Sequence, residues 1–284
     1  MRKTILSTVL AGAFFTTSLF AVTPDEARQL FEQRDQGREF SLKAADAYKT
    51  LATESRNEVE KAAFKINEAE ALYFHIGLIP DDRSNKKEKL AKYERAYEAA
   101  DSGASILASS PGTAKKPEYK PELARAYYWY GANLGKWGET KGVLASLGRW
   151  GDLKEHVQYA IDLDKTIEDY GPNRIFSRAF IKVPFESNDE ALAYAREAYD
   201  NTLTTISGIE LSRHTTTVLY YLYALENRRQ TNTFCEVFDN FLDLSRLSDA
   251  ELLQYNPKRL PETKADIKEF ENDSDINEYY DDNC

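Results

Sequence analysis

The chain has 284 residues, of which 42% are hydrophobic, and this is enough to form a sizeable core or an extended array of packed helices. Glycine (13) and proline (9) are too scarce for collagen-like or low-complexity structure, and they also disfavour a β protein rich in tight turns. The formal charge of −10 argues against nonspecific binding to nucleic acid or to an anionic membrane. Composition therefore favours a helical protein and identifies no chemistry.

The first 21 residues are typical of a secretory signal peptide. Arg2 and Lys3 form a positive start, and an apolar stretch follows that ends at Ala21. The alternative is a retained membrane anchor, but the stretch is short and a charged segment begins at Asp25. No cysteine lies near Ala21 to carry a lipid. We therefore expect a soluble periplasmic or secreted protein with no stable membrane anchor after cleavage.

Between residues 22 and 264 the apolar residues recur at steps of three and four, the spacing of one helix face. In chain order this pattern predicts an N-terminal helix over 24–51, helices over 59–76 and 90–107 separated by a turn at 80–85, and helices over 123–137, 147–161, 191–198, 218–225 and 234–241. The second of the two helices around the turn is expected to end at Pro111-Gly112. The β-branched segments 202–206 and 215–221 lie inside longer patterns of the same spacing, so we interpret both as helix.

Similar groups of aromatic residues recur in three of these helices, at 71–74, 126–129 and 218–221. Their separations of 55 and 92 residues differ from the roughly 34-residue period of a tetratricopeptide repeat (TPR), so we infer a lost period or inserted segments. Chance similarity among tyrosine-rich helices is the alternative. We expect an all-α fold over residues 22–264, an array of antiparallel helical hairpins that forms a TPR-like α/α repeat bundle.

An ordered set of motifs lies between Ala124 and Pro184. Residues 124–137 read Ala-Arg-Ala-Tyr-Tyr-Trp-Tyr-Gly-Ala-Asn-Leu-Gly-Lys-Trp, residues 160–164 read Ala-Ile-Asp-Leu-Asp, residues 170–174 read Tyr-Gly-Pro-Asn-Arg, and Val183-Pro184 follows. In this order they resemble the TPR-like T component family associated with tripartite ATP-independent periplasmic (TRAP) transporters. The resemblance implies a periplasmic helical bundle without enzymatic activity, which partners with a solute-binding protein of a transporter and holds a small hydrophobic or organic-acid ligand.

The same segment supplies the candidate binding residues. Arg174 follows Gly171-Pro172, a predicted turn that would direct its side chain toward an anionic ligand. The alternative, which we favour, is an ion pair with a helix end or with Asp162 or Asp164, because such pairs are common in helical bundles and no second cation adjoins Arg174. Side chains of the helix over 123–137 are candidates for lining a pocket, although aromatic residues at helical spacing also form ordinary cores: Tyr128, Trp129, Tyr130, Asn133 and Trp137.

No catalytic motif is evident. The only histidines are His75, His156 and His214, and they lack the spacing of a zinc site; no nucleophile elbow or phosphate-binding loop occurs. We therefore predict no enzyme, no cofactor and no metal site, and instead an exported protein that binds an envelope protein partner or a small ligand. The alternatives are an envelope enzyme whose site assembles from dispersed carboxylates and histidines, and a purely structural envelope scaffold.

Residues 265–284 carry eight acidic side chains against Lys268. Block charge of this kind is typical of a solvated and mobile tail. Asp273-Ser274-Asp275 invites a calcium interpretation, but the ligand spacing of an EF-hand is missing.

The chain holds two cysteines, Cys235 in a predicted helix and Cys284 at the C-terminus. Two thiols in an oxidising compartment are commonly paired, and a bridge here would tie the tail to the last hairpin. The alternative is a buried Cys235 and a free terminal thiol. Two cysteines without a neighbouring histidine do not form a zinc site.

Overall fold

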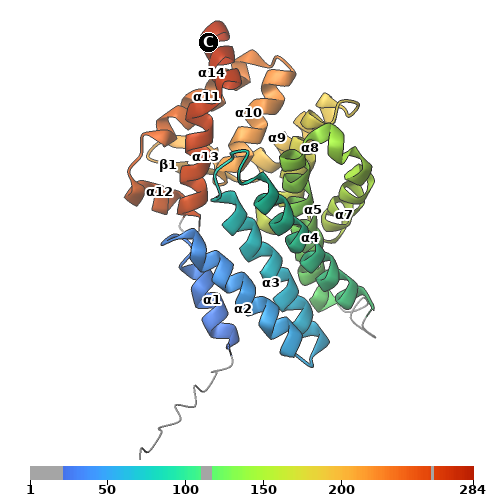
Figure 1. Cartoon of the computed structure of the whole chain (residues 1–284). Helices are drawn as coiled ribbons and strands as arrows, with labels where there is room; N and C mark the ends of the chain where they lie inside the picture. Colours follow the sequence, from blue (N-terminus) through green and yellow to red (C-terminus); the bar gives the residue numbers. More distant parts are fainter. Residues whose placement is uncertain (1–21, 110–116, 257–258) are drawn as a thin grey trace, which may run out of the picture.

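A computed structural model describes residues 22–109, 117–256 and 259–284 (Figure 1). Helices dominate these residues, which confirms the predicted all-α class. The predicted signal peptide at 1–21 and the predicted helix end at Pro111-Gly112 lie outside the described residues. In chain order the elements are α1 (Pro24–Glu32), α2 (Arg38–Glu54), α3 (Glu58–Gly77), α4 (Lys86–Ser109), a 3-10 turn (Pro117–Tyr119), α5 (Lys120–Lys141), α6 (Val143–Ser146), a 3-10 turn (Leu147–Arg149), α7 (Trp150–Asp164), α8 (Ile167–Lys182), α9 (Asn188–Asp200), β1 (Leu203–Ile206), β2 (Ile209–Ser212), α10 (Thr215–Asn227), α11 (Thr231–Ser245), α12 (Asp249–Tyr255), α13 (Leu260–Asn272) and α14 (Ser274–Asn283).

Neighbouring helices along the chain pack against one another: α2 on α3, α3 on α4, α4 on α5, and α5 on both α7 and α8. Figure 1 shows the array bending until the C-terminal helices (orange to red) lie beside the N-terminal ones (blue to teal). An ion pair of 3.3 Å between Arg34, just after α1, and Glu262 on α13 joins these two ends. Among the described residues, no helix has the length and apolar character needed to cross a membrane.

The N-terminal segment forms two helices where the sequence predicts one. α1 begins at a capping box, in which the Thr23 main-chain N–H donates to the Glu26 carboxylate (2.8 Å) and the Glu26 N–H donates to the Thr23 hydroxyl (3.2 Å). The chain leaves this helix at Gln33, and α2 starts after Gly37. The single-helix prediction was wrong because mostly helix-tolerant polar residues fill the interval and Gly37 alone marks the break.

Residues 203–212 form a β-hairpin, which corrects the helical interpretation of 202–206. The strands pair antiparallel, with Leu203 opposite Ser212. Between them Ser207 and Gly208 have φ angles of 50° and 83°, and a two-residue turn with positive φ at both positions matches the twist of paired strands. In a run of β-branched residues this short, the spacing of apolar residues does not distinguish a strand from a helix. The segment 215–221, in contrast, lies in α10 as predicted.

Residues 265–284 are packed helix and not a solvated tail. They form most of α13 and all of α14, which bury Ile267, Phe270 and Ile276 in a core shared with α10 and α11. Cys235 on α11 and Cys284 after α14 form a disulfide, with Cα atoms 5.7 Å apart. The tail prediction was wrong because the exposed acidic residues conceal the three- and four-residue spacing of the buried apolar ones.

Gly131 allows α7 to approach α5 closely. A Cβ atom added at Gly131 would lie 2.5 Å from Val157 Cγ2, whereas at Gly135, one turn later, it would meet Leu153 at an ordinary 3.6 Å. We expect Gly131→Ala to lower the free energy of unfolding by about 1–3 kcal/mol, because α7 must shift. The matched variant Gly135→Ala should leave it unchanged or raise it by up to about 1 kcal/mol. Urea unfolding measures both, and equal losses would contradict the close contact.

The disulfide should contribute substantially to stability. It closes a loop with a sequence separation of 49 residues, for which the chain-entropy account gives about 4 kcal/mol. Cys235→Ser and Cys284→Ser should each lower the free energy of unfolding by an amount of this order, and the double variant should lose no more than either single one. Losses that add in the double variant would mean that each sulfur acts separately from the other.

Candidate functional site

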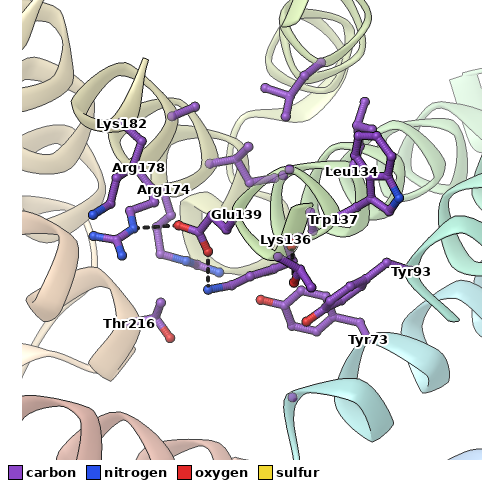
Figure 2. A pocket seen from close by; sticks show the side chains of 18 of the residues that line it. Tyr73, Tyr93, Leu134, Lys136, Trp137, Glu139, Arg174, Arg178, Lys182 and Thr216 are labelled. Atoms are coloured by element: carbon purple, nitrogen blue, oxygen red, sulfur yellow. Dashed lines mark hydrogen bonds and ion pairs between the residues drawn. The ribbon is translucent and has the colours of Figure 1, made fainter. Parts of the chain in front are cut away.

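A cavity of about 470 Å³ lies between helices from both ends of the array, within the range of roughly 300–1,000 Å³ typical of small-molecule sites. Side chains from α3, α4, α5, α8, α10 and α13 line it. Figure 2 shows Arg174, Arg178 and Lys182 on one side of this space and Leu134 and Trp137 on the other. The cavity therefore has a cationic side and an apolar side.

Glu139 on α5 is the centre of an ion network in the cavity wall. Its carboxylate lies 3.0 Å from Lys136 Nζ and 2.9 Å from Arg178 Nε on α8 (Figure 2). Burial alone raises the pKa of the Glu139 carboxyl, but the two cations outweigh this effect and lower it to about 2. The carboxylate in turn raises the pKa of Lys136 well above its usual range. All three groups are therefore charged at neutral pH, and they join α5 to α8.

A strained segment at the start of α8 precedes Arg174. Glu168, Asp169 and Tyr170 have φ angles of 50°, 55° and 60°, a left-handed conformation that costs roughly 1–2 kcal/mol for each residue other than glycine. Two ion pairs to the C-terminal part of the chain hold it: Asp169 with Arg213 at 2.5 Å, and Glu168 with Arg259. Strain of this kind is found at functional sites when the surrounding structure supports it.

The predicted turn at Gly171-Pro172 is instead the first turn of the regular helix that follows the strained segment. Proline is tolerated there because its missing N–H has no helical partner in a first turn. Gly171 is required at its position, since a Cβ atom would collide with the ring of Tyr128 on α5. This close approach brings the start of the regular helix of α8 against α5.

Arg174 is 4% exposed and lines the cavity. Its Nη1 donates to the main-chain carbonyl oxygen of Asp169 at 2.5 Å. Neither Asp162 nor Asp164 is its partner, and within the described part of the chain no carboxylate lies in ion-pair distance of it. The favoured prediction named a helix end or one of these carboxylates: the structure has no ion pair with either carboxylate, and the partner of Arg174 is a main-chain carbonyl oxygen just before the regular part of α8.

His214, at the N-terminal cap of α10, also lines the cavity and is 5% exposed. Neither of its ring nitrogens has a hydrogen-bond partner among the described residues. Burial, followed by the charges of Arg174, Arg259 and Arg213, lowers the pKa of His214 well below its usual range. The imidazole is therefore neutral, with one N–H able to donate.

Asp266 on α13 faces the same cavity. The hydroxyls of Thr215 and Thr216 donate to its Oδ2 at 2.5 and 2.8 Å. Burial raises the pKa of Asp266 to about 6, despite these hydrogen bonds, which act to lower it. The carboxyl of Asp266 consequently changes charge in the mildly acidic range.

The structure divides the sequence-predicted site residues between the cavity and the core. Tyr128, Trp137 and Arg174 line the cavity. Trp129 is fully buried away from it, and so is Asn133, whose amide donates to the Trp129 carbonyl at 2.8 Å. The hydroxyl of Tyr130 accepts a hydrogen bond from Arg149 at 2.9 Å, and its ring is buried in the central core.

Several cavity residues were missed by sequence reasoning. Arg178 and Lys182 follow Arg174 at steps of four, a spacing that places all three on one helix face. This signal was available, and it contradicts the view that no second cation accompanies Arg174. Lys136 and Glu139 likewise have the three-residue spacing of a helical ion pair. His214 and Asp266 carry no such signal, because only the bend of the array brings α10 and α13 to this cavity.

The described residues contain no group of three or more His, Cys, Asp or Glu side chains arranged to hold a metal ion. The chain matches no protein-family model, and the search of curated proteins gives no match either. The functional argument therefore depends on the geometry of the cavity.

The raised pKa of Asp266 predicts a pH-dependent stability difference. Its folded-state pKa of about 6 exceeds the ordinary value of 3.8 for an aspartic acid side chain, so the stability from this group is present below about pH 4 and is lost as the pH rises through 6. Asp266→Asn should match the wild type at pH 4 and exceed its free energy of unfolding by up to about 3 kcal/mol at pH 7. Urea unfolding between pH 4 and 7 measures the difference, and a difference independent of pH would contradict the prediction.

Proposed function

We propose that this protein is a non-enzymatic binding protein that encloses a small organic ligand in the cavity between α5, α8, α10 and α13. The observation that supports the proposal is one 470 Å³ space in which an apolar wall faces buried charged groups. Sites of this composition provide area for the body of a ligand and a few polar groups to orient it.

The arrangement of the walls also supports a built site. Leu134 and Trp137 on α5 and Ile175 on α8 line the cavity together with Lys136 and Arg178, whose charges are paired through Glu139. Pairing before the ligand arrives means that these groups need little rearrangement on binding, which reduces the free-energy cost of association.

An exported, TPR-like accessory role in a TRAP-type solute transport system is the biological setting that we propose. It is supported by the resemblance of residues 124–184 to the T component family and by the helical fold. The partner in this setting is an envelope protein, specifically a solute-binding protein. The TPR-like repeat arrangement and export both stay predictions.

An enzyme is the alternative, favoured by one observation: the cavity collects His214 and Asp266, two groups capable of proton transfer. Against it, no hydrogen bond among the described residues joins the two, and Asp266 already accepts from two hydroxyls. Substrate turnover that Asp266→Asn abolishes would establish the enzyme. A partner captured without any ligand for the cavity would favour the structural scaffold.

Filling the cavity tests the binding function. Ala179 on α8 lines the cavity, and Ala179→Phe should occupy part of it. Octanol and octanoate are both small enough for this volume and should raise the melting temperature of residues 22–284. The apparent affinity derived from this shift should be at least about fivefold weaker for Ala179→Phe, a change of about 1 kcal/mol.

The matched control is Ala250→Phe, because Ala250 is exposed on α12 outside the cavity. It should bind both compounds as the wild type does. Equal binding to the wild type and to Ala179→Phe would place the compounds elsewhere and refute the cavity as the binding site.

A further inference from the structure

The charges that line the cavity differ in sign from the protein as a whole. The chain has a formal charge of −10, yet seven cationic side chains and five carboxylates line the cavity. Each of the five carboxylates already accepts a hydrogen bond: Asp81 from Lys89, Glu139 from Lys136 and Arg178, Glu262 from Arg34, Asp266 from Thr215 and Thr216, and Glu269 from Tyr223. Glu262 Oε2 is buried without a partner among the described residues, so the cavity offers this acceptor as well as the donors of its cations.

Five of the seven cations have a carboxylate partner: Lys89 with Asp81, Lys136 and Arg178 with Glu139, Arg149 with Asp152, and Arg259 with Glu168. Arg174 and Lys182 have none among the described residues. Lys182 is exposed, so water solvates its ammonium. Arg174 is buried, and a buried cation without a counter-charge is costly.

The guanidinium of Arg174 has unused donors. Of its five N–H groups, the structure assigns one hydrogen bond, to the Asp169 carbonyl oxygen. His214 lines the same cavity, and both of its ring nitrogens lack a partner within the described part of the chain. Two nearly buried side chains with unsatisfied donors therefore occur at one cavity, which indicates an absent acceptor.

The opposite wall is apolar. Leu134 and Trp137 lie across the cavity from Arg174 in Figure 2. Val143, Leu147 and Leu153 are further apolar side chains of the cavity lining. A ligand that satisfies Arg174 therefore also places a hydrocarbon body against these side chains, where each buried methylene contributes about 0.8 kcal/mol.

We propose that the cavity binds an amphipathic monocarboxylate, with the carboxylate on Arg174 and His214 and the hydrocarbon body against Leu134 and Trp137. This inference rests on the proposed binding function and specifies its ligand class. The planar guanidinium fits a carboxylate through two parallel N–H donors. Arg174 is the one nearly buried cation of the lining without a carboxylate partner among the described residues, so a group with one negative charge matches it better than a doubly charged phosphate.

The test compares octanoate with three probes of the same chain length by isothermal titration calorimetry on residues 22–284: octanol, octyl phosphate and octyltrimethylammonium. The wild type should bind octanoate at least about tenfold more tightly than octanol, since a hydrogen bond to a charged group is worth about that factor or more. Octyl phosphate should bind more weakly than octanoate because its second negative charge has no second buried counter-charge, and octyltrimethylammonium should bind more weakly because Arg174 repels it. This comparison needs no variant and therefore does not depend on how well a variant folds.

Arg174→Gln should weaken octanoate binding about 10- to 100-fold and leave octanol binding within about twofold of the wild type. Arg174→Lys keeps the charge but loses the paired donors, so it should give an intermediate loss. The matched control is Arg246→Gln at the C-terminal cap of α11, which lies outside the cavity with 65% of its side-chain surface exposed and should change octanoate binding less than about threefold.

The outcomes separate this inference from the proposed function. If Ala179→Phe weakens both octanol and octanoate but Arg174→Gln changes neither, the cavity binds ligands and the carboxylate assignment is wrong. Octyl phosphate that binds more tightly than octanoate would also overturn the assignment. If Ala179→Phe changes the binding of none of the probes, both the proposed binding function of the cavity and the proposed ligand class are wrong.

Discussion

The carboxylate of Glu139 is the group on which the cavity depends. It holds Lys136 on its own helix and Arg178 on α8, so one ion network spans two walls. Charged groups of this kind cannot be packed into a dry core, because removing each ion from water costs several kcal/mol. Their partial exposure to the cavity is consistent with this constraint: Lys136 and Glu139 keep 32% and 28% of their side-chain surface accessible. The network thus joins α5 to α8 in the wall of the cavity while its charged groups stay partly solvated.

The strained start of α8 supplies the second constraint. Three consecutive left-handed residues would be unfavourable by themselves, but the carboxylates of Glu168 and Asp169 reach Arg259 and Arg213, which belong to the C-terminal part of the chain. The carbonyl oxygen of Asp169 then accepts from Arg174. The same short segment therefore connects the central helices to the C-terminal ones and orients the buried guanidinium, so the position of Arg174 depends on the closure of the array.

Sequence periodicity predicted most of the helices because their buried faces repeat at steps of three and four, as α3, α4 and α5 illustrate. Periodicity failed at the Ser207-Gly208 hairpin, because its strands are too short to show a period. It also failed at α13, because the many acidic residues there suggested a solvated tail and interrupt the apolar spacing. Within the site, the cations of α8 were visible as a four-residue spacing. The contribution of α10 and α13 was not, because it depends on contacts between residues far apart in sequence.

The contrast between an acidic protein and a cavity with excess cations has a consequence for selectivity. At physiological ionic strength, charges more than about 8 Å away are largely screened, so the lining groups and not the overall charge of −10 set the field inside the cavity. A small inorganic anion gains only this local attraction and loses its hydration on entry. An anion with a hydrocarbon body gains the burial of its methylene groups against Leu134 and Trp137 in addition. Charge and apolar area together therefore favour amphipathic anions, although neither feature alone would distinguish them from inorganic anions or from neutral amphipathic molecules.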